Sequence, residues 1–476
     1  MFNDKYLNKM DSFYFQRSLN FSIIYFLFFS LFSGVFLFSY KIFSFKYYFS
    51  NVFISLIIFI IFLAFLYEGF IKKNYTPLIL ILLMPLLILV FKSKIIVTMI
   101  YIIPFIRLLK NYFMKGIYFQ TTNKKSFFLI LLFTIFVFTN IFIKNHSLPS
   151  DFIAIFNLDI HTDTAVRLAV AEIFKNYYSI SSGVGSVAFT FSSFYSEIFF
   201  GSIIWLFNLK SYEFFYWFHY GFFYSLVIFL FTFFLQIAHY SKKEFKKILS
   251  LTIFFTLAFF IIKPETFSNL FGNLPFSFSL SVLLIMLVIV YRFLKDFKSP
   301  NYVLFNLMIF NILIILSKTI LAVFSLLICS YLIHKTKYST KLKVLLLFLF
   351  YFFSFLLAYL AIYQFISNNG IAFFSSSILN FNLFTFFEIL FAAICLTIFF
   401  KIFKLKKNLK YHSVEETNLI VYFIGLALIF IFCLRLFNFV GPQYFWLKIT
   451  SIIFFFPLVS IFTEISIKKI FKVKYI

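Results

Sequence analysis

Long apolar runs separated by short, mostly basic connections fill almost the whole chain. The runs are about 16 to 22 residues long, the length of a helix that crosses ~30 Å of hydrocarbon. Lipid offers no hydrogen-bonding partner to backbone N–H and C=O groups, so spanning segments must be helical. The pattern predicts an all-α, polytopic transmembrane helical bundle of about 13 to 15 spans, near 20–40, 51–70, 76–91, 95–109, 126–143, 214–237, 248–263, 275–291, 302–317, 319–333, 344–364, 382–400, 419–435 and 448–464.

Two runs leave the count of spans open. The run 95–109 is short and contains Pro104, so it and its neighbour could form one bent hairpin. The run 194–209 could cross the membrane, or it could be re-entrant or interfacial. A non-crossing 194–209 puts the basic clusters at 72–73, 107–125, 242–247, 335–343, 401–410 and 468–474 on one side of the membrane, and we therefore expect this arrangement.

The distribution of charge predicts an orientation. The net charge is +26, and the lysines gather in short clusters such as Lys72 with Lys73 and Lys242 with Lys243. Such clusters mark cytoplasmic connections, where anionic lipid headgroups are their partners. We expect a multi-pass protein of the cytoplasmic (inner) membrane with both termini in the cytoplasm. The same distribution argues against a nucleic-acid partner.

Composition supports a single integral membrane domain over residues 1–476. Hydrophobic residues make up 63% of the chain and charged residues only 12%, about half the charged fraction of a soluble domain. The 87 Phe residues are expected to be core or lipid-facing. The three cysteines lie within apolar runs, in a spacing that favours neither a disulfide framework nor a zinc site.

The longest polar interruption, 144–193, is expected to be the main extracytoplasmic loop. Its charged residues include Asp151, Asp159, Asp163 and Glu172, so it is acidic where nearly all other connections are basic. From about Thr162 onward its sequence predicts an amphipathic helix in the membrane interface, with Ala165, Leu168, Ala169 and Ile173 on one face.

Asp159 and Asp163 are the candidate catalytic residues of this loop. They are four residues apart, and one of them could take a proton from an acceptor hydroxyl. The pair could instead hold a divalent cation such as Mg²⁺ or Mn²⁺ on diphosphate oxygens, because hard cations prefer oxygen ligands. A structural interpretation stays open beside both: Thr162 or Asp163 is a good N-cap, and Asp163 with Arg167 makes an ordinary i, i+4 ion pair.

A helix that carries Asp163, Ala165, Ala169 and Ile173 just after a span resembles the first outer loop of the GT-C superfamily of membrane glycosyltransferases. Gly183 and Gly185 followed by a Tyr-led helix from Tyr195 continue the resemblance. The segments Lys263-Pro264-Glu265 and Gly441 to Lys448 are similar to outer loops of GT-C-like membrane proteins of unassigned function. The chain departs from the superfamily in placing five spans before the acidic loop and in following Asp163 with Thr164.

The resemblance implies an integral membrane glycosyltransferase that transfers a sugar from a polyprenyl-phosphate-linked donor on the outer face of the membrane. Asp163 would be the catalytic carboxylate and Asp159 its helper, and membrane lipid and the lipid-linked sugar donor would be the partners. Developing charge on the leaving phosphate needs cations. The substrate-binding candidates are Arg167, His161, Glu172, Arg435 and Lys448.

Two other functions remain open, a flippase or transporter and a polymerase of lipid-linked envelope polysaccharide. A transporter needs polar groups near the bilayer midplane. Glu388 lies inside an apolar run, and His219 lies near the expected outer end of another. An ionisable group at such a position is costly unless it is paired, which makes each of them a functional candidate.

Overall fold

Helices make up nearly all of the part of the chain that the structure describes, and no strand occurs there. All described residues belong to one of the chain's two compact units, the one made of residues 1–239 and 271–369. The structure is a computed structural model, and it describes residues 4–39, 45–113, 128, 130–132, 134–135, 162–178, 195–237, 274–296, 300–317, 321, 325–326, 328–330, 332–333, 336 and 338–369.

Three described segments are long and apolar enough to cross a membrane. They are Ser12–Val35 of helix α1 (Asp4–Ser39), Tyr48–Phe70 of α2 (Phe45–Phe70), and Trp217–Phe234. The third combines a π-helical segment, η1 (Trp217–Phe223), with the first part of α11 (Tyr224–Ile237). Length and composition therefore support membrane-spanning helices where the hydrophobic pattern predicts them.

Other predicted spans also coincide with helices. α14 (Leu274–Asp296), α15 (Pro300–Ser317) and α17 (Thr340–Asn369) cover the runs 275–291, 302–317 and 344–364 and extend beyond them. The extensions are expected, because helix propensity continues past the apolar stretch until a turn signal ends it. The predicted spans 248–263, 382–400, 419–435 and 448–464 lie outside the described residues, and 126–143 and 319–333 are described only in part.

The run 95–109 is part of one continuous helix, and the neighbouring run 76–91 contains a break. α5 (Lys94–Phe113) runs through Pro104 without a break, whereas the run 76–91 divides at Leu83 into α3 (Thr76–Leu82) and α4 (Met84–Phe91). Pro85 causes this break, because it has no N–H to donate to the Ile81 carbonyl. The chain tightens there instead, and the Leu86 N–H bonds the Leu83 carbonyl at 3.0 Å.

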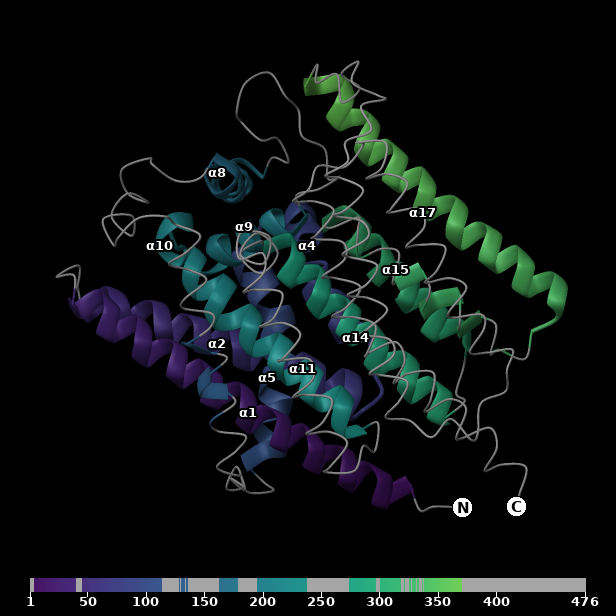
Figure 1. Ribbon diagram of the computed structural model, residues 1–476, viewed down its shortest axis with the longest axis horizontal. Coiled ribbons are helices and arrows are strands. Elements are labelled where there is room, and N and C mark those ends of the chain that lie inside the picture. The colour runs from purple at the N-terminus through teal and green to yellow at the C-terminus, as the bar shows by residue number, and fades with distance from the viewer. Residues whose placement is uncertain are drawn as a thin grey trace, which may run out of the picture. The chain divides into compact units, whose positions relative to one another are not determined.

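The core of the described unit is built around α14 and α11 (Figure 1). Residues 274–290 of α14 are all buried, as expected for a helix that is apolar on every side. α11 packs between α14 and α1, and its Phe229 ring lies 4.8 Å from that of Phe15. Gln236 donates a hydrogen bond to Ser18 of α1 across 2.9 Å. The abundant Phe residues thus include core contacts, as predicted.

Side chains from three helices bond the π-helical segment. The Tyr25 hydroxyl of α1 donates to the Tyr220 carbonyl at 2.9 Å, and the Ser55 hydroxyl of α2 donates to the Trp217 carbonyl at 3.2 Å. His219 lies fully buried here, with its Nε2 2.9 Å from the Ser277 hydroxyl of α14. These bonds hold the wider helical turn in place. The structure therefore places His219 inside the helical core.

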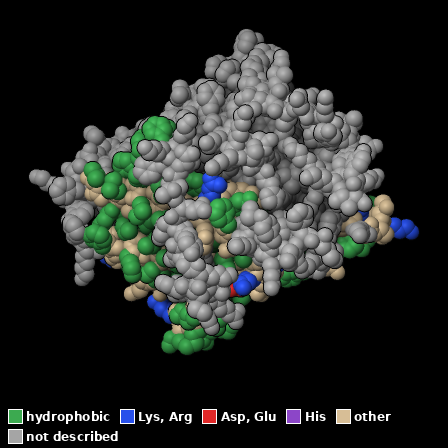
Figure 2. Space-filling model, turned by 90° about the horizontal axis from the view of Figure 1, so that it is seen from below, with side chains coloured by type: hydrophobic (Ala, Val, Ile, Leu, Met, Phe, Trp, Pro, Cys, Tyr) green, Lys and Arg blue, Asp and Glu red, His purple; other side chains and the backbone are tan. Residues whose placement is uncertain are grey.

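Large apolar side chains also remain on the surface of the described unit. Leu27, Leu31 and Val35 of α1 are each about 60% exposed, and their spacing of four residues puts them on one helix face. On the face that Figure 2 shows, hydrophobic side chains cover much of the described surface, and Lys and Arg appear at only a few points. Apolar stripes of this kind are typical of surfaces that contact lipid or another protein.

Three connections meet around Tyr302, at the start of α15. The Tyr302 hydroxyl accepts from the backbone N–H groups of Tyr75 and Thr76, each at 3.1 Å. The neighbouring Asn301 accepts a hydrogen bond from the Tyr338 hydroxyl. The connections before α3, before α15 and before α17 therefore lie together, and the charge pattern assigns all three to the cytoplasmic side.

Candidate functional site

The loop helix predicted from Thr162 is confirmed as α8 (Thr162–Tyr177). The backbone of Asp163 belongs to its first turn. Asp159 and His161 lie outside the described residues, as do Arg435, Lys448 and Glu388. Their predicted roles stay predictions. Within α8, the side chains are described from Arg167 onward.

The buried face of α8 differs from the predicted one. Leu168, Ala171 and Phe174 are buried, whereas Ala169 and Ile173 are only half-buried. The cause is α9 (Tyr195–Phe207), which packs along this side of α8. The predicted face assumed a lipid surface as the only partner of the helix.

Arg167 forms an ion pair with Glu197 of α9. Glu197 is fully buried, and its second carboxylate oxygen accepts a hydrogen bond from the Ser196 hydroxyl at 2.6 Å. The Arg167 side chain keeps 17% of its surface exposed. A guanidinium has five N–H donors in a fork, so one side of it can hold Glu197 while the other meets a ligand.

Glu172 occupies a different position on the same helix. One of its oxygens accepts from the Ser211 backbone N–H at 2.6 Å, at the start of α10 (Ser211–Tyr216). The other oxygen lies 3.3 Å from the Lys175 ammonium. A carboxylate at a helix N-terminus satisfies a free N–H and opposes the helix dipole. In this structure Glu172 joins α8 to α10, and its predicted substrate-binding role remains untested.

Tyr195 fixes the beginning of α9. Its hydroxyl donates to the Leu82 carbonyl at 2.6 Å. This carbonyl lies at the break between α3 and α4, where Pro85 interrupts the regular helical bonding. The break thus provides an acceptor for the neighbouring helix, and one tertiary hydrogen bond satisfies two buried polar groups.

Gly201 sets the distance between α8 and α9. A Cβ atom at this position would lie 2.8 Å from the Ala171 carbonyl oxygen and 3.1 Å from Phe174 Cβ. Gly201→Ala is therefore expected to force the helices apart and to destabilise the protein by about 1–3 kcal/mol, seen as a lower thermal midpoint in detergent.

Gly221→Ala is the matched control for that prediction. Gly221 is also buried in a helix, but its nearest neighbour to a new Cβ would be a Phe29 ring carbon at 3.3 Å. A side chain can move where a backbone carbonyl cannot, so we expect the smaller loss here. Equal loss in the two variants would show that the α8–α9 contact is not unusually close.

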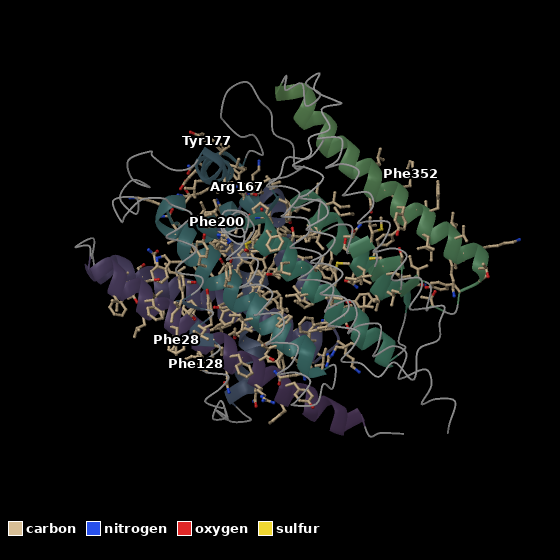
Figure 3. The ribbon with its side chains drawn as sticks, viewed as in Figure 1. Phe28, Phe128, Arg167, Tyr177, Phe200 and Phe352 are labelled. Carbon is tan, nitrogen blue, oxygen red and sulfur yellow. The ribbon has the colours of Figure 1, made fainter. Side chains whose placement is uncertain are left out.

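α8 and α9 lie at one end of the helices that form the core. Figure 1 views α8 nearly along its axis, whereas α11 and α14 run across the picture. α9 has only 13 residues, about 20 Å of helix, too short to cross the hydrocarbon. In Figure 3, Arg167 and Tyr177 lie at this end, with Phe200 of α9 beside them. The expected interfacial or re-entrant 194–209 is consistent with this arrangement.

No group of three or more His, Cys, Asp or Glu residues that could hold a metal ion occurs among the described residues. Asp159 and the Asp163 side chain do not belong to the described part of the chain, so the predicted divalent cation remains a prediction. Comparison with known proteins gives no match: no family model, characterised protein or solved structure is significantly similar to the chain.

Glu197, the partner of Arg167, was not predicted from the sequence. A signal for it was available, since Glu197 is the only acidic residue in the apolar run 194–209. A carboxylate in such a run is costly to bury unless a cation or a hydrogen bond compensates it. The preceding helix offers two cations as partners, Arg167 and Lys175.

Proposed function

We propose that the chain is a multi-pass glycosyltransferase of the GT-C type that takes its sugar from a polyprenyl-phosphate-linked donor on the outer face of the cytoplasmic membrane. The observation that carries the proposal is the docking of α8 on α9 through the buried Arg167–Glu197 pair. It fixes a helix with a carboxylate in its first turn and a guanidinium one turn later at the end of an apolar bundle.

The contacts of the connections support the proposed orientation. Connections assigned to the cytoplasm meet around Tyr302. At the other end, the α4–α5 connection lies against the end of α8 and against α9, with Lys94 over the Trp205 ring. Counting spans from the cytoplasmic lysine clusters places these segments on the outer side, although Lys92 and Lys94 make the α4–α5 connection itself basic.

The proposed reaction uses these groups in a direct way. The acceptor hydroxyl oxygen bonds to the anomeric carbon while the bond from that carbon to the phosphate oxygen breaks. The hydroxyl proton passes to the Asp163 carboxylate, and polyprenyl phosphate leaves with its electron pair. Arg167 would stabilise the charge that develops on the phosphate, for which a planar guanidinium is well shaped.

A donor assay tests this function. Protein in lipid nanodiscs, given a labelled sugar on polyprenyl phosphate and an envelope-glycan acceptor, is expected to release polyprenyl phosphate and to transfer the label. The same sugar on a nucleoside diphosphate is expected to stay unused. Use of the nucleotide donor alone, or movement of uncleaved lipid-linked sugar across a sealed vesicle, would contradict the proposal and favour another enzyme or a carrier.

Cysteine labelling tests the orientation. In a chain whose three native cysteines are replaced by alanine, Tyr177→Cys at the exposed end of α8 should react with a membrane-impermeant maleimide in intact cells. Lys341→Cys, exposed at the start of α17, should react only after permeabilisation. The reverse order, or equal labelling of both in intact cells, would contradict the orientation.

A further inference from the structure

The connection between α4 and α5 carries two lysines at its tip. Lys92 ends α4 in the left-handed backbone conformation, with φ at 48°, and Lys94 begins α5. Both lysines are exposed. Their neighbours are also exposed and apolar: Val90 is 73% exposed and Ile95 69%. Two cations therefore lie between exposed apolar helix faces.

Aromatic rings from the α8–α9 layer lie beside both lysines. The Lys92 ammonium is 5.9 Å from the centre of the Tyr178 ring, and that of Lys94 is 5.5 Å from the Trp205 ring. Trp205 Nε1 donates to the Tyr178 hydroxyl at 3.2 Å. Ring faces attract cations. The hydrogen bond from the Trp205 indole N–H orients the Tyr178 hydroxyl oxygen. Residues of four elements thus form one group, which we call the lysine–aromatic cluster.

We propose that the lysine–aromatic cluster binds the phosphate group of an anionic phospholipid in the outer leaflet. The two ammonium groups supply the charge, and the Tyr178 hydroxyl, which accepts from Trp205, can donate its own proton to a phosphate oxygen. Among the described residues neither lysine has an acidic partner, so the cluster has positive charge to offer an anion.

The surface around the cluster indicates a lipid rather than a soluble phosphate. Exposed apolar side chains continue along both helices, including Leu86 on α4 and Met99 and Ile103 on α5. Acyl chains can lie along this stripe while the headgroup stays at the tip. Trp and Tyr next to lysines are also typical of the boundary between hydrocarbon and water.

A bound lipid at this position would brace the candidate site. Tyr178 directly follows α8 and Trp205 lies near the end of α9, so a headgroup held between them and the α4–α5 tip would join three elements. Such binding requires the membrane orientation but no sugar transfer. An absence of lipid binding would therefore not argue against the proposed sugar transfer. An absence of sugar transfer would likewise not argue against lipid binding.

Fluorescence quenching of Trp205 tests the proposal. In a Trp217→Phe/Trp446→Phe background Trp205 is the one remaining tryptophan. Vesicles contain phosphatidylcholine with a small share of either brominated phosphatidylglycerol or brominated phosphatidylcholine. We expect at least about twofold stronger quenching by the anionic quencher, the ratio that a binding difference of about 0.4 kcal/mol gives. Equal quenching by the two lipids would overturn the proposal.

Two matched variants identify the groups responsible. Lys92→Gln/Lys94→Gln should abolish the preference for the anionic lipid. Lys72→Gln/Lys73→Gln is the matched control and should preserve the preference. This pair also lies in a connection between two helices, and Lys73, like Lys92, has the left-handed backbone conformation. Equal loss in both pairs would show unspecific attraction and overturn the proposal. Release of the quenching by inorganic phosphate would also overturn it, by identifying a soluble-anion site.

Discussion

Arg167→Met is expected to destabilise the protein by about 3–5 kcal/mol. The change leaves the fully buried Glu197 carboxylate without its guanidinium, with the Ser196 hydroxyl as its remaining recorded partner among the described residues. Because removing one partner of a buried pair strands the other charge, the loss should far exceed that of a surface ion pair. Unfolding of the purified protein by SDS, followed by circular dichroism, measures it.

The double variant Arg167→Met/Glu197→Leu is expected to recover most of the lost stability. Replacing a buried ion pair by apolar residues of similar size is often neutral or stabilising. Lys175→Met is the matched control, because Lys175 of α8 pairs with Glu172, whose side chain is partly exposed where that of Glu197 is buried. A loss of stability below about 1 kcal/mol is expected for this variant. An Arg167→Met protein as stable as the wild type would show that the pair does not hold α8 on α9.

The double variant also separates the two roles assigned to Arg167. If Arg167 serves only to dock α8, the refolded double variant should transfer sugar at the wild-type rate. If the guanidinium also stabilises the leaving phosphate, the variant should fold well and still lose most of its activity. We expect the second result.

Much of the helical layout could be predicted from the hydrophobic pattern. The runs 51–70, 275–291 and 302–317 all coincide with helices, because apolar length alone requires a helix in lipid. The start of α8 at Thr162 was also predictable, since the polar residues before it give way to a helical period there. The ends of the helices were less predictable, as α1, α2 and α17 extend well beyond their apolar parts.

The packing of the site could not be predicted in the same way. For Arg167 the sequence suggested Asp163, four residues earlier, as a partner. In the structure Arg167 pairs with Glu197, 30 residues later on another helix, and the Asp163 side chain lies outside the described residues. The buried face of α8 depends on Gly201, which lets α9 approach closely. The π-helical segment at Trp217–Phe223 could likewise not be predicted from its apolar sequence, because the side chains that bond its carbonyls, Tyr25 and Ser55, are far away in sequence.

Asp163→Asn is expected to lower sugar transfer by about 10²- to 10⁴-fold, the usual contribution of a general base. The substitution should have little effect on stability, because Glu197 keeps the Arg167 guanidinium paired in the absence of the Asp163 charge. Asp159→Asn, at the predicted helper, should cause a smaller loss. An asparagine has nearly the shape of an aspartate, so the loss would come from the missing proton acceptor.

The proposed function is tested most directly by the rate at which Asp163→Asn releases polyprenyl phosphate from the lipid-linked sugar, compared with the wild type. Both proteins should be in the same nanodiscs, at equal amounts of folded protein as judged by their SDS unfolding curves. We expect the wild type to release polyprenyl phosphate and the folded variant to release it at least about 100-fold more slowly. Release by the folded variant at the wild-type rate would contradict a catalytic role for Asp163.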